Sequence, residues 1–266
     1  MRGHIYRRGR NSWGITFDLP AVHGKRKQET ITVHGTRADA ERECARLLSA
    51  VHNQTYVHPS RTTVGDYLER WLEFKQSSIS KKTWERYAEI AHLHLTPAFG
   101  ALSLAKLHPR MIQQYYTQAL AHGRRNGRGG LAPRTVLHHH RVLREALQQA
   151  VRWQLLVHNP ADATEPPVPQ RKQMMAYDED QIVQLIEAAQ GTPFEIPILL
   201  AGTCGMRRGE ILRVAWPNIQ LDQPTPSLEV VRTLEQVGNQ VEFKEPKTDK
   251  ARRRIDLSQD AIQGLR

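Results

Sequence analysis

Two residues in the last third of the chain have types and spacing that suit phosphate chemistry. Arg207 and Glu210 stand three positions apart in the segment 205–210 (GMRRGE), at a glycine-containing break between two apolar runs. An arginine side chain is a planar, always-charged fork that matches a phosphate group. Glu210 shares a helix face with Arg207 and can hydrogen-bond Arg207 or the nearby backbone, which would fix its orientation. The segment therefore predicts an anion site with a supporting carboxylate.

A lysine follows in a second motif. We expect strands at 241–244 and 252–257, with Lys247 in the turn 246–250 (PKTDK) between them. A lysine close to a leaving-group oxygen can act as a general acid when desolvation or neighbouring positive charge lowers its pKa. Each motif is weak alone, because an Arg–Glu pair on a helix surface and an ordinary hairpin tip have the same patterns.

The charge of the chain is unevenly distributed. The 266 residues carry a formal net charge of +11 and leave room for two or three domains. Residues 1–60 hold 10 Lys and Arg against 5 Asp and Glu, residues 61–173 hold 17 against 8, and residues 174–266 hold 11 against 14. The first two-thirds therefore carry the affinity for a polyanion, whereas the last third is nearly balanced, which suits a site.

The cysteines and the apolar runs indicate the compartment. Cys44 and Cys204 are far apart and predict neither a disulfide framework nor a cysteine metal site, which favours a reducing compartment. The N-terminus lacks the apolar stretch of a secretory signal, and the longest apolar run, near 196–201, is far too short to span a bilayer. We therefore expect a soluble, cytoplasmic protein.

Residues 1–58 are predicted to form a small sheet followed by one helix. Apolar residues alternate with small or polar ones over 13–19, and 29–33 reads as a further strand. Thr36 is expected to cap the helix, with Asp39 completing a capping box. A basic hairpin backed by a helix can enter a DNA major groove, although a solvated module with a charged loop has the same pattern. The DNA-binding candidates, which we expect at one end of the hairpin, are Arg7, Arg8, Arg10, Lys25, Arg26 and Lys27.

Residues 62–158 are predicted to form a bundle of four helices. Thr63 begins the first helix, whose inner face extends to Phe74, and Pro97 and Gly100 are expected to end the second. The aromatic residues at helical spacing are predicted to be core rather than platforms for bases, and the adjacent histidines 138–140 point in different directions, which argues against a metal site. A flexible basic loop is expected at 123–130. The DNA-binding candidates of this region are Lys81, Lys82, Arg124, Arg125, Arg128, Arg134 and Arg141.

The proline-rich segment 159–173 is predicted to be an extended, semi-rigid linker and the clearest domain boundary. Helices are expected after it, starting near 178, over 193–201 and over 208–215, followed by strands.

The order and spacing of these pieces resemble the tyrosine recombinase (phage integrase) family over nearly the whole chain. The segment 203–216, which begins TCGMRRGEIL, is similar to the family's first arginine motif, and 246–257 is similar to its β-hairpin lysine motif. The resemblance implies an α+β, multidomain fold. Its parts would be a three-stranded arm-type DNA-binding domain with one helix at 1–58, a helical core-binding (SAM-like) domain at 62–158, and at 174–266 the N-terminal part of a mixed α/β catalytic domain with a β-hairpin.

The resemblance also implies a reaction, which is site-specific recombination or integration of double-stranded DNA. A tyrosine hydroxyl attacks a scissile phosphate and forms a 3′-phosphotyrosine link, arginines stabilise the phosphorane, and a lysine protonates the 5′-oxygen that leaves. By resemblance Arg207 is the first catalytic arginine, Lys247 the acid and Glu210 a supporting residue, since the motif spacing favours Arg207 over Arg208. The implied partners are arm-type and core-type DNA sites and, for full-length members, a homotetramer on DNA. No metal ion or other cofactor is implied.

The sequence departs from the family pattern after the lysine motif. The family's His-x-x-Arg box and its nucleophilic tyrosine lie further on, whereas the last histidine here is His158 and the last tyrosine, Tyr177, precedes Arg207. We therefore expect a chain truncated within the catalytic domain, without a nucleophile and inactive alone. Its apolar residues at 196–201 and 230–231 are expected to be left uncovered.

Two other interpretations stay open. A non-catalytic, sequence-specific DNA-binding protein, either an integrase remnant or a regulator, would account for the basic first two-thirds. A helical regulator unrelated to recombination would require both motif matches to be coincidences.

Overall fold

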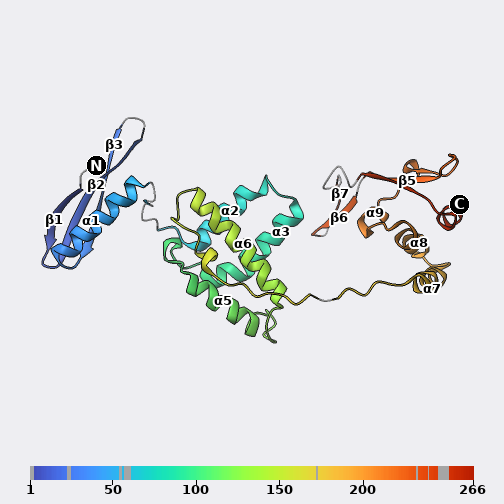
Figure 1. The fold of residues 1–266 in the computed structure, drawn as a ribbon, viewed down its shortest axis with the longest axis horizontal. Coiled ribbons are helices and arrows are strands. Elements are labelled where there is room, and N and C mark those ends of the chain that lie inside the picture. Colours follow the sequence, from blue (N-terminus) through green and yellow to red (C-terminus); the bar gives the residue numbers. More distant parts are fainter. Residues whose placement is uncertain are drawn as a thin grey trace. The chain divides into compact units, whose positions relative to one another are not determined.

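A computed structural model describes residues 3–22, 25–53, 56, 61–171, 173–231, 233–238, 240–244 and 252–266. The fold is α+β and multidomain, as the sequence predicts, and Figure 1 shows its elements in chain order. The chain divides into two compact units, one formed by Met1–Ile79 with Arg86–Pro169 and the other by Ser80–Glu85 with Gln170–Arg266. Among the described residues, no helix combines the length and apolar character needed to cross a membrane.

The N-terminal region is a three-stranded antiparallel sheet with one helix against it (Figure 1). The strands are β1 (Gly3–Gly9), β2 (Ser12–Val22) and β3 (Lys25–His34), in the order β1-β2-β3. The predicted alternation is confirmed, because Ile15 and Phe17 of β2 are fully buried. Helix α1 (Arg37–His52) begins after Thr36, and Thr36 and Asp39 form the predicted capping box. The apolar face of α1 and the odd-numbered residues of β2 make the core of this region.

The opposite face of the sheet is polar. Thr16 of β2 and Thr30 of β3 exchange a hydroxyl hydrogen bond of 2.8 Å, and Arg8 of β1 donates to the hydroxyl of Thr32 on β3. Tyr6 lies over Gly14, where a Cβ atom would come within 2.3 Å of its ring, so this position requires glycine. The face away from α1 therefore presents hydroxyl, guanidinium and phenol groups.

The basic residues of the sheet do not gather at one end, which corrects the prediction. Arg10 lies in the turn between β1 and β2, next to Ser12, whereas Lys25 pairs with Val22 at the far end of β2 and Lys27 pairs with Leu19. In a meander the two turns must lie at opposite ends of the central strand, and sequence patterning alone did not separate them. The side chains of Lys25 and Arg26 lie outside the described residues.

The helical region is built mainly from four helices, as predicted. They are α2 (Val64–Gln76), α3 (Lys81–Ile90), α5 (Pro109–His122) and α6 (Pro133–Arg152). Shorter elements join them, namely the π-helical turn η1 (Ala91–Leu95), α4 (Thr96–Phe99) and the 3₁₀ turn η2 (Leu104–Lys106). The predicted aromatic core is confirmed for the fully buried Tyr67 and Trp71 of α2, and the Tyr67 hydroxyl donates to the carbonyl of Ala146 at 2.5 Å.

Two details of this region differ from the prediction. Phe74 is 48% exposed rather than core, and its ring makes a T-shaped contact with that of Trp153. Pro97 does not itself end the second helix, because α3, η1 and α4 follow one another with helical backbone at each junction, and the π-helical turn η1 precedes the proline. The predicted end at Gly100 is confirmed, since Gly100 is the C-terminal cap of α4.

The histidine triplet of α6 divides between the bundle and the surface. His139 and His140 are buried, and their Nδ1 atoms lie 2.7 Å from the hydroxyls of Tyr115 and Tyr116 on α5, respectively. His138 is exposed. The three rings therefore diverge, as the helical geometry predicts, and two of them cross-link α5 to α6.

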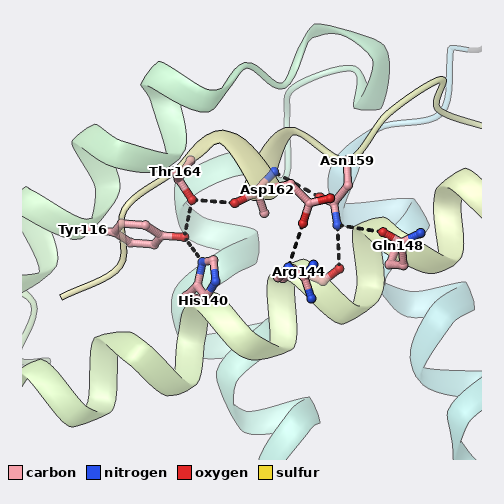
Figure 2. A network of polar contacts seen from close by, with 8 residues as sticks. Tyr116, His140, Arg144, Gln148, Asn159, Asp162 and Thr164 are labelled. Carbon is pink, nitrogen blue, oxygen red and sulfur yellow. Dashed lines mark hydrogen bonds and ion pairs between the residues drawn. The ribbon is translucent and has the colours of Figure 1, made fainter. Parts of the chain in front are cut away.

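The first part of the predicted linker is docked on the bundle (Figure 2). Asn159 caps the 3₁₀ turn η3 (Pro160–Ala163), and its side-chain amide donates to the carbonyl of Arg144 at 3.0 Å. The Arg144 guanidinium donates to Asp162 at 2.7 Å, and Thr164 lies 3.5 Å from the Tyr116 hydroxyl. Residues 159–165 therefore belong to the helical region and not to the linker. The prediction missed this because proline content alone does not reveal these polar contacts.

The described residues of Gln170–Arg266, the main part of the second unit, form three helices, then short strands and a last helix. The elements are α7 (Glu179–Ala189), α8 (Glu195–Cys204), α9 (Arg208–Ile211), the 3₁₀ turn η4 (Trp216–Asn218), β4 (Ile219–Gln220), β5 (Ser227–Val230), β6 (Thr233–Val237), β7 (Gln240–Lys244), β8 (Arg253–Asp256) and α10 (Gln259–Leu265). The third helix is thus shorter than the predicted 208–215.

The strands form two antiparallel sheets, β4-β5-β8 and β6-β7. The strands expected to flank Lys247 therefore pair elsewhere among the described residues, since β7 pairs with β6 and β8 with β5. The turn itself, including Lys247, lies outside the described residues.

The apolar residues of the second unit are covered only in part, so the expectation of an uncovered apolar surface is wrong for some residues and confirmed for others. Ile196 and Ile198 are half-buried, Ala201 is exposed, and Trp216 is 67% exposed. Leu199 and Leu200 of α8 and Val230 of β5 are buried. Leu200 and Val230 share a core with Ala261 and Ile262, because α10 supplies an apolar face that the prediction did not take into account.

The buried histidine of α6 predicts a pH-dependent stability. Burial, followed by the positive charges of His94, Arg86 and His138, lowers the pKa of His139 to about 4. The pKa of an unfolded histidine is about 6.5, so between these two values the unfolded chain binds more protons than the folded one, and stability falls as pH drops through this window. We expect the thermal midpoint of the helical signal to decrease from pH 7 to pH 4.5.

A variant without the His139 imidazole should show a smaller decrease of the thermal midpoint between pH 7 and pH 4.5. His139→Gln keeps a hydrogen-bonding group next to Tyr115 and removes the titration, so circular dichroism melts should show a shallower pH slope. His122→Gln, which changes an exposed histidine on α5, is the matched control. Equal slopes for wild type and His139→Gln would contradict the assignment.

Candidate phosphate-binding site

The central feature of the second unit is a buried carboxylate held by two arginines. Glu210 is 6% exposed. Its Oε1 accepts from Arg207 Nη1 at 3.1 Å and from Arg253 Nη1 at 2.9 Å. Its Oε2 accepts from the Arg207 backbone N–H and from Arg253 Nη2, both at 2.9 Å. Each oxygen thus receives one hydrogen bond from each arginine residue.

This arrangement keeps Glu210 ionised. The Arg253 guanidinium, supported by the Arg207 backbone and side chain, lowers the pKa of Glu210 to about 2 against the opposing effect of burial. The same contact raises the pKa of Arg253. Hydrogen bonds to the charged form of a carboxyl group favour that form, so Glu210 is ionised at neutral pH.

The backbone positions Arg207 at the break between two helices. Helix α8 ends at Cys204, and Gly205 takes the left-handed conformation with φ of 60°. Met206 then buries its side chain, and Arg207 becomes the capping residue of α9, with extended backbone. The predicted glycine break is therefore a helix end that redirects the chain immediately before the arginine.

The side chain of Arg207 combines support with exposure. Its Nη1 donates to Glu210, yet 76% of the side-chain surface is exposed. A guanidinium carries five N–H donors in a rigid fork, so an anion in solution can approach the group from the side away from Glu210. The neighbouring Arg208 is exposed at the start of α9, and it is Arg207 that contacts the carboxylate, which supports the predicted choice between them.

Arg253 was not predicted from the sequence. It lies on β8, opposite Val230 of β5, and its side chain is 31% exposed. The segment 252–257 (RRRIDL) could have indicated Arg253. Strand alternation places it, alone of the three arginines, on the same face as Ile255 and Leu257. A contact across 43 positions cannot be read from spacing within either motif.

A second basic surface lies on the helical region. Arg134, His138 and Arg141 follow one exposed face of α6, and Arg86 of α3 lies close enough that its charge acts on His138. Burial and then Arg141, Arg86 and Arg134 lower the pKa of His138. Arg86 was not among the predicted residues. It could have been included, because it lies four residues after Lys82 and therefore on the same face of α3. The predicted Lys81 and Lys82 are exposed in the first turn of α3.

The predicted basic loop between α5 and α6 has defined turns. The Arg124 backbone N–H donates to the carbonyl of Gly129 at 3.1 Å, and its Nε donates to that of Gly130 at 2.9 Å. Arg124 thus closes the loop on itself, and it is exposed, as are Arg125 and Arg128. The flexibility expected for this loop stays a prediction, and the contacts of Arg124 distinguish it from the candidate contact residues Arg125 and Arg128.

The glycine before Arg207 gives a testable prediction. A Cβ atom at Gly205 would meet nothing within 4 Å, so the cost of Gly205→Ala is backbone strain alone. We expect a loss of about 1 kcal/mol in the free energy of unfolding, measured by urea denaturation. Gly205→Asn should lose less, because asparagine tolerates the left-handed region better. Equal stability of the alanine variant and wild type would contradict the helix-end assignment.

Comparisons with known proteins converge on one family. Residues 63–120 match the family model of the phage integrase N-terminal SAM-like domain. An integrase from Saccharopolyspora erythraea is 26% identical over 165 residues, which cover 59% of this chain and 36% of that protein. A tyrosine recombinase XerC-like protein from Caldanaerobacter subterraneus subsp. tengcongensis is 24% identical and covers 76% of this chain and 51% of its own length.

The fold has the same relatives. The Tn1549 transposon integrase, solved in complex with a circular intermediate DNA, superposes with a TM-score of 0.64 over 76% of this chain and 63% of that chain, at 14% identity. The chain thus spans between about a third and two thirds of the length of these relatives. Together with the arginine motif, these matches show that the chain belongs to the tyrosine recombinase (phage integrase) family.

Proposed function

We propose that these 266 residues form the DNA-binding regions and the first phosphate-binding half of a site-specific recombinase. The reaction is the breakage and rejoining of double-stranded DNA through a 3′-phosphotyrosine link. One observation carries the proposal: the buried Glu210 fixes Arg207 while leaving its guanidinium exposed. A supported, solvent-facing arginine is suited to bind a phosphate that arrives with a macromolecule.

The chemistry assigned to each residue follows from this geometry. Arg207 would donate to the non-bridging oxygens of the scissile phosphate and stabilise the charge that grows as the fifth oxygen approaches. Lys247 would protonate the 5′-oxygen as it leaves, in keeping with its place in the lysine motif. Glu210 would act on Arg207 rather than on DNA, because both of its oxygens are occupied by arginine donors.

The DNA contacts are assigned to three regions. Residues 1–58 would bind arm-type sites, and the polar face of the sheet with Arg8 and Tyr6 is the surface proposed to enter the groove. The helical region, extended here to residue 165, would bind core-type sites through the exposed face of α6. Residues 174–266 would carry the phosphate site, and complete recombinases of this family would assemble as tetramers on DNA in the cytoplasm.

The basic face of α6 predicts salt-dependent binding. Each phosphate contact releases counterions. A plot of the logarithm of the association constant against the logarithm of the salt concentration should therefore have a negative slope of about 0.9 per contact. In fluorescence anisotropy titrations with duplex DNA at several salt concentrations, Arg141→Ala should make this slope less steep by about 0.9. Arg110→Ala removes an exposed arginine at the start of α5 and serves as the matched control. Salt-insensitive binding would count against the proposal.

The position of the tyrosines predicts no covalent product from these residues alone. Every tyrosine precedes Arg207 in the sequence, and Tyr177, the last of them, lies just ahead of α7 and is 67% exposed. We assign the nucleophile to none of them. The 266-residue chain, incubated with a nicked suicide duplex carrying a bound site, should give no protein–DNA adduct in a denaturing gel. An adduct that Tyr177→Phe abolishes would overturn this assignment.

A further inference from the structure

A second arginine meets the carboxylate that supports Arg207, and its geometry is that of a paired fork. Arg253 Nη1 and Nη2 donate to separate oxygens of Glu210, each at 2.9 Å. Such a bidentate contact fixes the plane of a carboxylate as well as its position. The terminal torsion of a glutamate side chain is otherwise broad and roughly two-fold. Arg253 therefore determines the directions in which the lone pairs of Glu210 point.

The orientation of Arg207 depends on that plane. Glu210 Oε2 accepts from the backbone of Arg207 and Oε1 accepts from its guanidinium, so the carboxylate holds both ends of the residue. If the carboxylate turned, the bond to Nη1 would be lost while the backbone bond could persist. The side chain of Arg207 is 76% exposed and has little other packing to hold it. Its direction is therefore set by Glu210, and that of Glu210 by Arg253.

The charges lead to the same conclusion. One carboxylate between two guanidinium groups leaves one positive charge in excess. Arg253 is the less exposed of the two, at 31%, and makes the bidentate contact. It therefore supplies most of the compensation of Glu210, as the cause of the lowered pKa of Glu210 also indicates. Arg207 is left with its charge available to an anion, instead of being drawn fully onto the carboxylate.

We propose that Arg253 is a positioning residue for phosphate binding, which orients Arg207 through Glu210 and leaves its charge free for the phosphate. This inference rests on the proposed function, because it assigns a role within the same site. It also connects two parts of the chain, since Arg253 on β8 follows Lys247 by six positions while Glu210 belongs to α9. The contact thereby ties the strand that follows the lysine motif to the arginine motif.

The test uses the full chain with ¹⁵N-labelled arginine and inorganic phosphate as the probe. The Nε–Hε signal of Arg207 is assigned by its loss in Arg207→Lys. In wild type we expect this signal to shift saturably with phosphate and to show the relaxation of an ordered side chain. In Arg253→Gln we expect the phosphate Kd to rise at least five-fold and the Arg207 signal to show the relaxation of a mobile side chain.

Matched variants separate positioning from general stability. Arg254→Gln changes the neighbouring residue of β8, whose side chain faces outward and donates to the carbonyl of Thr225, and it should keep the phosphate Kd within two-fold of wild type. Arg253→Lys keeps the charge but cannot bind both oxygens, and we expect an intermediate Kd with the fold retained. This variant decides the question if Arg253→Gln fails to fold by circular dichroism.

The possible failures are distinguishable. A phosphate Kd and an Arg207 relaxation unchanged in folded Arg253→Gln, or in Arg253→Lys where the former does not fold, would overturn the role of Arg253 and leave the phosphate site intact. Absence of any phosphate-dependent shift of Arg207 in wild type would remove the phosphate site itself, and with it the role assigned to Arg253.

Discussion

The second unit depends on the burial of one negative charge. A carboxylate removed from water must be compensated, and breaking such a buried pair by removing one partner typically costs about 3–5 kcal/mol. Glu210 meets this requirement with two arginines that come from a helix start and from a strand 43 positions later. The requirement fixes where α9 begins, which residue of β8 faces inward and how Arg207 is held. The four hydrogen bonds between Glu210 and the two arginines all serve to compensate this buried charge.

Local patterns were predictable, because they rest on local forces. The capping box of Thr36 and Asp39 and the alternation around Ile15 are determined within a few residues, and both are confirmed. The Arg207–Glu210 contact is of the same kind, since it joins a capping residue to a position three residues on. The burial of Glu210 was not predictable, because Arg253 of β8, which binds both of its oxygens, lies 43 positions away in the sequence.

The remaining differences have non-local causes. Arg253 is identified by strand pairing, and the docking of 159–165 by polar contacts of Asn159 and Asp162 with α6. Neither the position of Arg253 nor the docking of 159–165 can be recognised from the composition of the sequence. The basic residues show the same limit, because Arg124 and Arg144 have the charge of DNA contacts yet engage a loop carbonyl and Asp162, respectively. Net charge therefore overstates the number of arginines available to a polyanion.

The meander of the N-terminal sheet has a consequence for how far apart its basic residues lie. Strand β2 contains eleven residues, so its two ends lie about 33 Å apart at 3.3 Å per residue. Arg10 follows β1 beside one end of β2, and the start of β3 pairs with the other. Two cations at this separation lie beyond the Debye length of about 8 Å at physiological ionic strength, so the two ends of the sheet attract an anion independently of each other.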